Sequence, residues 1–167
     1  ILNHNSLIAF PPEIAELKNL EILSLADNPL RSIPWEIAKL NKLRSINLSN
    51  TQLTTFPQGI KLLENLEFLN LSGNQLQSIP RVIGQLKNLT ILKLERNQLR
   101  TLPREIKELK KLKELYIYQN DFQEFSDFLL KEDFPLVVKC FSRDHPHSMF
   151  SNAACSLYVQ QSHFSNL

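Results

Sequence analysis

Apolar and polar residues follow one another in a fixed but uneven order along most of the chain, as the stretch NLEFLNLSGNQLQSIPRVIGQLK (65–87) shows. Neither a helical period near 3.6 nor a strand period of 2 fits the whole stretch. The pattern therefore predicts a segment that changes conformation partway along its length.

This pattern returns every 23 residues. A partial copy, residues 1–18, precedes five full copies that follow one another without an insertion. The full copies are residues 19–41, 42–64, 65–87, 88–110 and 111–133. Self-similarity at a fixed period of this length predicts a repeat architecture.

Each 23-residue unit contains two kinds of apolar spacing. The fifth and seventh positions are apolar with polar or variable neighbours, which predicts a short strand with one buried face. The fifth position holds Leu23, Ile46, Leu69, Leu92 and Leu115, and the seventh holds Leu25, Leu48, Leu71, Leu94 and Ile117. A later proline (Pro34, Pro57, Pro80 or Pro103) is expected at the first turn of a short α or 3-10 helix. Each unit is thus predicted to be strand, turn and helical return.

One unit cannot bury its own apolar side, so we expect identical units to stack in parallel as a solenoid. Neighbouring strands lie about 4.8 Å apart, whereas helical returns need more width. The stack is therefore predicted to curve, with the strands on the inner face.

An asparagine column follows the predicted strands, at Asn5, Asn28, Asn74, Asn97 and Asn120. An amide side chain can satisfy backbone donors and acceptors where the chain turns out of the strand ladder. Thr51 interrupts the column. We therefore expect the ladder to be weakest there and Thr51→Asn to raise the melting temperature.

The pattern LxxLxLxxNxL followed by xxIPxxIxxLxx, as in residues 89–112, resembles the leucine-rich repeat (LRR) family, and the phrases NQLQSIPRVIGQLKNL and NQLRTLPREIKELKKL resemble the 23-residue LRR proteins of pathogenic spirochaetes. This resemblance implies an α/β LRR solenoid: a right-handed β-α superhelix shaped as a short horseshoe, with a parallel concave sheet and short convex helical segments. It also implies a binding role through the concave face, often toward host proteins, and favours a secreted or cell-surface location.

Two regions are expected along the chain, the repeats in residues 1–133 and a terminal strand with a C-terminal cap in residues 134–167. Extending the register places Val138 and Cys140 at the fifth and seventh positions of one more unit. The remaining tail loses the period, and solenoids need a different end unit to cover their last apolar layer. The N-terminal end shows no comparable cap, since Ile1 begins mid-unit, so we expect either that preceding residues are missing or that the exposed edge pairs with another molecule.

The tail gathers Cys140, His145, His147, Cys155 and His163. Thiolate and imidazole are zinc ligands, so Cys140, His145, His147 and Cys155 are candidates for a zinc site, although their spacing matches no recognised finger. A Cys140–Cys155 disulfide is an alternative in an oxidising compartment. The favoured interpretation makes Cys140 a core residue and the histidines part of a solvated loop.

Side chains at the fourth, sixth and eighth positions are expected on the concave face. The first units carry mainly small polar groups there, whereas later units carry aromatic and charged ones, which dominate interface energies when desolvated. We predict a partner-binding patch formed by Phe68, Ile91, Lys93, Glu95, Arg96, Tyr116 and Tyr118. Alternatively, the face is a solvated sheet without a partner, or Tyr116 and Tyr118 pack beneath the cap.

Outside this face, Trp35 is expected to cover its neighbouring repeat, with anchoring of a partner as the alternative. The charged residues of the helical returns, among them Arg104, Glu105, Lys107 and Glu108, are expected to be solvated.

Composition narrows the functional classes. The chain has 167 residues, 43% of them hydrophobic and 22% charged, with a formal net charge of +2, typical of a folded domain without the basic stripe that nucleic acid requires. No apolar run is long enough to span a bilayer. Three glycines are too few for a phosphate-cradling loop, and no CxxC, HExxH or GxSxG motif occurs. No cofactor is expected.

These observations favour a non-enzymatic module that binds a protein or extended peptide. Two alternatives remain. One is a structural protein that self-assembles through its N-terminal edge, and the other is a thiol- or zinc-dependent enzyme using the C-terminal cysteines and histidines.

Overall fold

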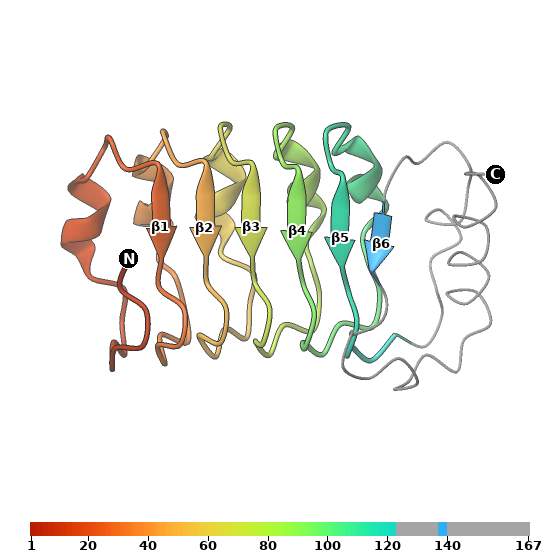
Figure 1. Cartoon of the computed structure of the whole chain (residues 1–167), viewed down its shortest axis with the longest axis horizontal. Helices are drawn as coiled ribbons and strands as arrows, with labels where there is room; N and C mark the ends of the chain where they lie inside the picture. Colours follow the sequence, from red (N-terminus) through yellow and green to blue (C-terminus); the bar gives the residue numbers. More distant parts are fainter. Residues whose placement is uncertain (123–136, 140–167) are drawn as a thin grey trace.

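The protein is described here by a computed structural model, which defines residues 1–122 and 137–139. Its sheet contains six parallel strands that follow one another in chain order, with a helical return between neighbours from β1 to β5 (Figure 1). The strands are β1 (Ile22–Ser24), β2 (Ser45–Asn47), β3 (Phe68–Asn70), β4 (Ile91–Lys93), β5 (Glu114–Tyr116) and β6 (Val137–Lys139). The predicted stacked architecture is confirmed.

The strands pair in the frame set by the 23-residue period. Leu23 pairs with Ile46, and the same column continues through Leu69, Leu92 and Leu115 to Val138. The terminal strand predicted around Val138 is therefore present as β6, whereas Cys140 lies outside the described residues.

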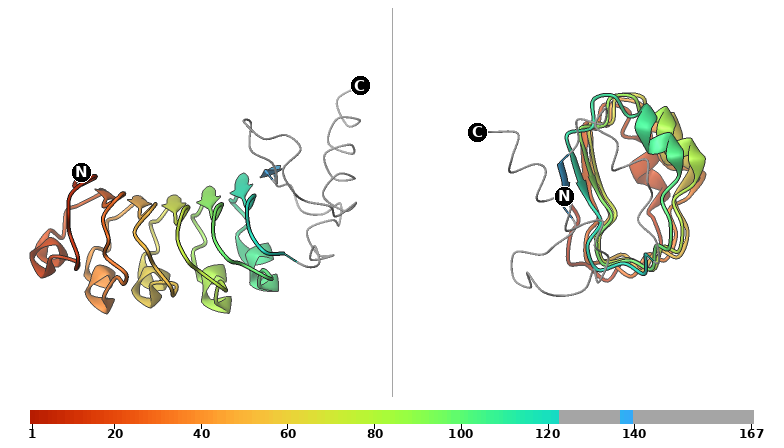
Figure 2. Two further views of the ribbon diagram at one scale, coloured as in Figure 1. Left: turned by 90° about the horizontal axis from the view of Figure 1, so that it is seen from below. Right: turned by 90° about the vertical axis from the view of Figure 1, so that its right-hand side faces the viewer.

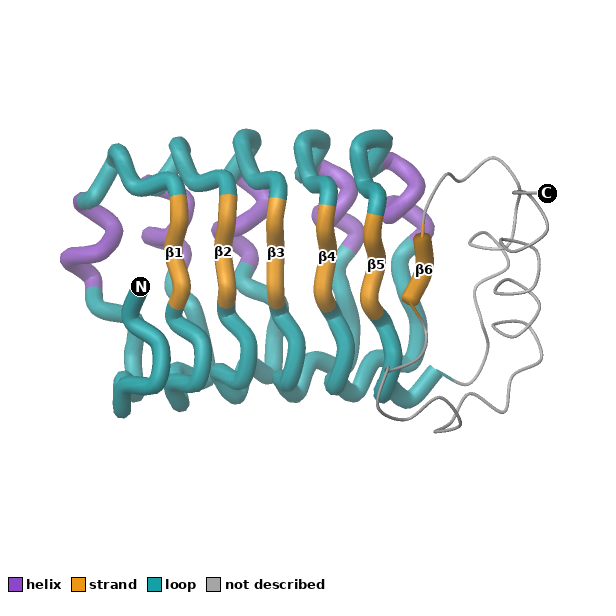
Figure 3. Tube along the Cα trace, viewed as in Figure 1, coloured by secondary structure: helices purple, strands orange, loops and turns teal. Residues whose placement is uncertain are grey.

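Within residues 1–122, five 3-10 helices form the side of the solenoid opposite the sheet (Figure 3). They are η1 (Pro12–Glu16), η2 (Trp35–Lys39), η3 (Gln58–Leu62), η4 (Arg81–Gln85) and η5 (Arg104–Glu108). In η2 to η5 the repeat proline immediately precedes the helix in an extended conformation, as Pro34 does with φ −74° and ψ 165°. The prolines were predicted inside the first turn. They instead lie one residue before the helix, because their fixed φ also suits an extended backbone. Each proline therefore ends the preceding loop.

The core is a continuous apolar seam between strands and helices. Leu23 is 3% exposed, and the four residues below it in the column, Ile46, Leu69, Leu92 and Leu115, are fully buried. Seen from the side, the helices are spaced more widely than the strands, so the sheet lies on the concave face (Figure 2). This curvature is the one expected when narrow strands and wider helices share a period.

Asparagine side chains tie consecutive repeats together beneath the turn that follows each strand. The Asn74 Nδ2 atom donates to the carbonyl oxygens of Leu71 in its own repeat at 2.9 Å and Leu48 in the preceding repeat at 2.8 Å. Its Oδ1 atom accepts from the backbone N–H of Leu53 at 2.9 Å. One buried amide thereby satisfies several backbone groups that have left the strand ladder.

The same bonds recur at Asn28, Asn97 and Asn120. Asn5 differs because it is exposed and its Nδ2 atom donates only to nearby carbonyl oxygens, those of Leu2 and Asn3.

Thr51 makes a different set of contacts. Its buried hydroxyl donates to the Leu48 carbonyl oxygen at 2.7 Å. Within the described residues it reaches neither the Leu25 carbonyl nor the Leu30 N–H, which an asparagine at this position would bind. The Leu30 N–H turns instead to the carbonyl of Asn28 at 2.8 Å.

The ninth position of every repeat has a left-handed backbone. It is occupied by His4, Asp27, Asn50, Gly73, Arg96 and Gln119, with φ between 53° and 65°. Only glycine adopts this conformation without a steric cost, and asparagine and aspartate tolerate it better than arginine or glutamine. The turn thus imposes its geometry on unsuitable residues, since the stacked neighbours fix the path of the chain.

Candidate protein-binding surface

The predicted site residues lie on the concave face of β3, β4 and β5 and in the turns that follow. We use the term concave patch for Phe68, Ile91, Lys93, Glu95, Arg96, Tyr116 and Tyr118. Phe68, Ile91 and Lys93 belong to strands that pair directly, and Lys93 pairs in register with Tyr116. The regular stacking thus brings residues 23 positions apart in sequence side by side.

Lys93 occupies the centre of the patch between two aromatic rings. Its Nζ atom lies 4.9 Å from the centroid of the Tyr116 ring and 6.0 Å from that of Phe68. Attraction between the ammonium group and the ring faces holds this long side chain across the sheet. The lysine therefore presents its charge in a defined position on a half-buried aromatic platform.

Tyr116 links this platform to an acidic group, because its hydroxyl donates a hydrogen bond to the Glu114 carboxylate. Glu114 was not predicted as a patch residue. Its position at the fourth site of its unit, one strand beyond Ile91, was the signal that it shares this face.

Glu95 differs from every other eighth-position residue of the described repeats in placing a carboxylate in a buried setting. Its side chain is only 7% exposed, and its Oε2 atom is buried without a hydrogen-bond partner. Burial raises the pKa of Glu95, against smaller lowering effects from its own backbone N–H and from the charges of Lys93 and Arg96.

Arg96 lies at the exposed rim of the patch. Its Nε atom donates to Oε1 of Gln119 in the next repeat at 2.9 Å. Both residues have a left-handed backbone, so the turns project their side chains in parallel.

Toward the N-terminus the concave face is more self-contained. The Ser24 hydroxyl donates to Oδ1 of Asn3 at 2.6 Å, and the Ser72 hydroxyl donates to Oδ1 of Asn70 at 2.7 Å. These small polar groups satisfy one another within the solenoid.

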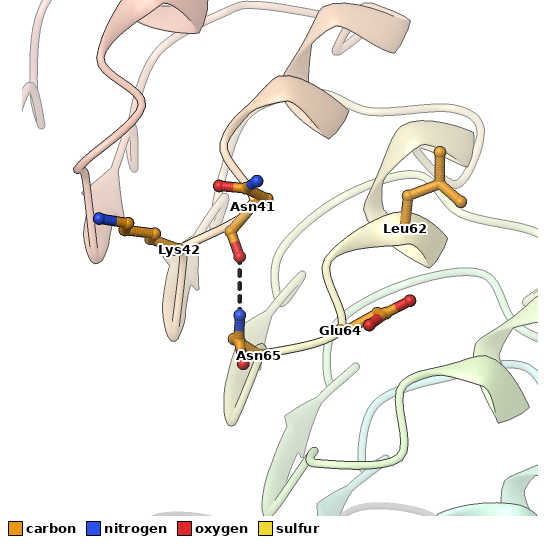
Figure 4. A pocket seen from close by; sticks show the side chains of 5 residues that line it. All are labelled: Asn41, Lys42, Leu62, Glu64 and Asn65. Carbon is orange, nitrogen blue, oxygen red and sulfur yellow. Dashed lines mark hydrogen bonds between the residues drawn. The ribbon is translucent and has the colours of Figure 1, made fainter.

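Two shallow hollows lie on the flank of the solenoid, where the helical return turns into the next strand. One, of about 420 Å³, is lined by Asn41, Lys42, Leu62, Glu64 and Asn65 (Figure 4). The other, of about 370 Å³, is lined by Glu21, Lys42, Arg44, Asn65, Glu67 and Asn88. Neither includes a residue of the concave patch.

The flank hollows were not predicted, although their signal was the polar first position of each unit. The Asn65 Nδ2 atom donates to the Asn41 carbonyl oxygen at 2.8 Å (Figure 4). The Lys42 ammonium donates to Oδ1 of Asn19 at 2.8 Å. These bonds link successive repeats, so the polar side chains on this flank contribute to the structure of the stack.

Trp35 and Glu105 lie on the helical side. Trp35 is 53% exposed, and Nζ of Lys61 in the next repeat lies 5.2 Å from its ring centroid. The tryptophan therefore contacts its neighbour and remains half open to solvent. Glu105, expected to be solvated with the other charges of its helix, instead has an 18% exposed side chain whose Oε2 atom is buried without a hydrogen-bond partner. The charged side chains of the helical returns are therefore not all solvated, although the helices are spaced more widely than the strands.

The zinc and disulfide candidates Cys140, His145, His147 and Cys155 lie outside the described residues. Across residues 1–122 and 137–139, no cluster of three or more histidine, cysteine, aspartate or glutamate side chains could hold a metal ion. The part of the chain that the structure defines also contains no helix with the length and apolar character needed to cross a bilayer.

The sequence matches the family model described as a leucine-rich repeat region over residues 35–132, and a leucine rich repeat model over residues 1–53. The chain belongs to the leucine-rich repeat family. No curated protein matches it.

Solved structures with the same fold include proteins of very different length. A leucine-rich repeat protein of Leptospira interrogans is 36% identical with a TM-score of 0.72, over 83% of this chain and 37% of that one. The LRR ectodomain of the Arabidopsis thaliana receptor kinase GASSHO1/SCHENGEN3, in complex with CASPARIAN STRIP INTEGRITY FACTOR 2, is 30% identical with a TM-score of 0.64, over 78% of this chain and 16% of that one. PEPR1 in the PEPR1–AtPEP1 structure is 28% identical with a TM-score of 0.69, over 80% and 20%. The present chain thus spans a minor part of each.

Proposed function

We propose that the protein is a recognition module that binds a protein or an extended peptide through the concave patch. The observation that carries this proposal is the grouping of Phe68, Lys93 and Tyr116 as a preformed, half-buried aromatic and cationic platform. Aromatic and basic side chains contribute most to interface energies when a partner removes them from water. The proposal assigns no catalytic residue.

The family and its solved relatives support a binding role. The GASSHO1/SCHENGEN3 ectodomain was solved in complex with CASPARIAN STRIP INTEGRITY FACTOR 2, and PEPR1 was solved with AtPEP1. Because the chain is similar to the Leptospira protein, the first version of this function to test is that of a bacterial protein that binds host proteins. The partner is therefore sought among host proteins as well as bacterial ones.

Self-association is the second candidate. Ile22 in β1 is 60% exposed and Leu62 at the end of η3 is 47% exposed, so apolar side chains of the described repeats are available for contact with a second copy. Sedimentation velocity separates the two functions, because concentration-dependent association is required for self-assembly and a monomer at all concentrations eliminates it.

The binding function is tested with the double variant Tyr116→Ala/Tyr118→Ala. Partners retained by the immobilised wild type from host and bacterial lysates are identified, purified and titrated against both forms. We expect the variant to weaken affinity by about 2 kcal/mol or more, since interface aromatic anchors contribute on this scale.

The matched control is Asn47→Ala/Ser49→Ala, which changes the same sixth and eighth positions three units earlier on the same face. It should retain full affinity. A partner that binds wild type and tyrosine variant equally well would move the binding surface away from the concave patch.

A further inference from the structure

Glu95 holds a carboxylate oxygen in a buried position without a hydrogen-bond partner. Buried polar atoms are nearly always hydrogen-bonded, and an unpaired buried carboxylate is costly. The packing of the repeats does not require this charge, because the equivalent residues in other units are Ala26, Ser49, Ser72 and Tyr118, none of which is charged. A carboxylate at this point therefore calls for a role beyond stacking.

The nearest cations are engaged elsewhere. The Lys93 ammonium lies over the Tyr116 and Phe68 rings, and the Arg96 guanidinium donates to Gln119. Among the residues that the structure defines, Glu95 takes part in no ion pair. The charge of Glu95 is thus left without a direct counter-ion inside the repeats.

The surroundings of Glu95 suit a positively charged side chain. The Arg96 N–H donates to the Tyr118 carbonyl oxygen at 3.0 Å, which places the start of the next turn beside Glu95. Tyr118 occupies the eighth position of that neighbouring unit and is half-buried. A carboxylate next to an aromatic residue offers an ion pair to a cationic head and a ring to its stem or plane.

We propose that Glu95, with Tyr118, forms a subsite of the concave patch that receives a basic side chain, arginine or lysine, of the bound protein or peptide. This inference rests on the proposed function and specifies the chemistry of its partner. On binding, the Glu95 side chain turns outward to meet the incoming guanidinium or ammonium group, which supplies the hydrogen bond that its Oε2 atom lacks in the free protein. Lys93 and Arg96 flank the subsite, so they disfavour a run of basic residues and select a single cation set among neutral or acidic neighbours.

The test uses small probes and backbone amide chemical shifts of the full chain. Acetyl-arginine amide and acetyl-lysine amide are titrated in parallel with acetyl-citrulline amide, which keeps the shape of arginine without its charge. The variants are Glu95→Gln and, as a matched control, Glu105→Gln. Glu105 also has a buried oxygen without a hydrogen-bond partner but lies in η5, away from the concave face.

We expect at least one basic probe to shift the Glu95 and Tyr118 resonances with an affinity about tenfold higher than that of the citrulline probe, as a charged hydrogen bond predicts. Whichever basic probe binds more tightly identifies the side chain. Glu95→Gln should abolish the preference for charge, and Glu105→Gln should retain it.

Equal binding of charged and neutral probes by the wild type, or an unchanged preference in Glu95→Gln, overturns the subsite. Such a result leaves the proposed function standing if the tyrosine variant still loses its purified partner. Thermal unfolding of Glu95→Gln verifies that any loss of binding occurs in a folded protein.

Discussion

The Nδ2 atom of Asn97 donates a hydrogen bond to the carbonyl oxygen of Leu71, 26 residues earlier in the chain, at 3.0 Å. This bond crosses from one repeat to the one before it. The same link recurs at Asn28, Asn74 and Asn120, and Thr51 is the position in this series where it is missing among the described residues. The asparagine column therefore joins repeats as well as shaping each turn.

Thr51→Asn should stabilise the protein. The new amide would reach the Leu25 carbonyl oxygen and the Leu30 N–H. These groups correspond to the Leu48 carbonyl oxygen and the Leu53 N–H, which Asn74 binds one repeat later. Two added buried hydrogen bonds, less the lost hydroxyl bond, should raise the free energy of unfolding by about 1 kcal/mol. Thermal and urea unfolding measure this gain.

The reverse exchange, Asn97→Thr, is the control for that prediction and should destabilise by a similar amount. Asn97 is two units away from Thr51, so the effects should add in the double variant. A melting temperature for Thr51→Asn several degrees below that of the wild type would contradict this account of the column.

Gly73→Ala should destabilise for two separable reasons. Gly73 has φ 65°, and a Cβ atom there would lie 1.9 Å from Oδ1 of Asn50 in the preceding repeat. The backbone term costs about 1 kcal/mol, and displacing the Asn50 side chain also breaks its bond to Asp27. Chemical denaturation measures the total.

A double-variant cycle with Asn50→Ala separates the two terms, because that change removes the clashing atoms and leaves the backbone strain. Gly73→Ala should cost less in the Asn50→Ala background than in the wild type. If Gly73→Ala lowers the free energy of unfolding equally in both backgrounds, the Asn50 side chain moves away from the new Cβ atom at no energetic cost.

Glu95→Gln should stabilise the protein at neutral pH and lose that advantage in acid. Burial raises the pKa of Glu95 in the folded state, so folding favours its protonated form. The wild type therefore has the full contribution of this group below the ordinary glutamate pKa and loses it as pH rises through the raised pKa. Glutamine does not titrate, and its advantage above that pKa should be about 1 kcal/mol.

Urea unfolding of both proteins at about pH 4 and about pH 8 checks this sign. The difference in free energy of unfolding should grow with pH. A constant difference would mean that Glu95 titrates alike in the folded and unfolded states.

Lys61→Met should weaken the contact between the second and third helical returns. The Lys61 ammonium lies over the ring of Trp35, the single tryptophan in the sequence. Losing this cation–π contact at a half-exposed site should cost up to about 1 kcal/mol. It should also alter tryptophan emission in the folded state. Lys110→Met, two repeats farther along the chain, should leave the emission unchanged.

The periodic part of the fold could be predicted because translation by 23 residues gives each column the same surroundings. Leu23 and Leu115 share one environment, so their spacing alone placed the strands, the register and the buried seam. The 3-10 returns followed from the apolar residues after each proline.

Departures from the period could not be predicted in this way. Glu95 is buried in a column that otherwise holds Ala26, Ser49, Ser72 and Tyr118, so neither its residue type nor its place in the repeat indicated this burial. Arg96 and Gln119 adopt a left-handed backbone against their own preference, because the stack imposes the turn. The residues of the concave patch were predicted from their types and positions in the repeat. The contacts of Lys93 with the aromatic rings and of Tyr116 with Glu114 could be seen only in the three-dimensional structure.

Thr51 weakens one interface between repeats, that between residues 19–41 and 42–64. In a solenoid each unit is held only by its two neighbours, so the weakest junction sets where order is first lost. We expect heat or mechanical load to separate residues 19–41 from residues 42–64 first, without breaking the chain. The concave patch, which includes Phe68, Lys93 and Tyr116, would stay folded on the C-terminal side of this interface. Binding should therefore survive partial unfolding of the N-terminal repeats.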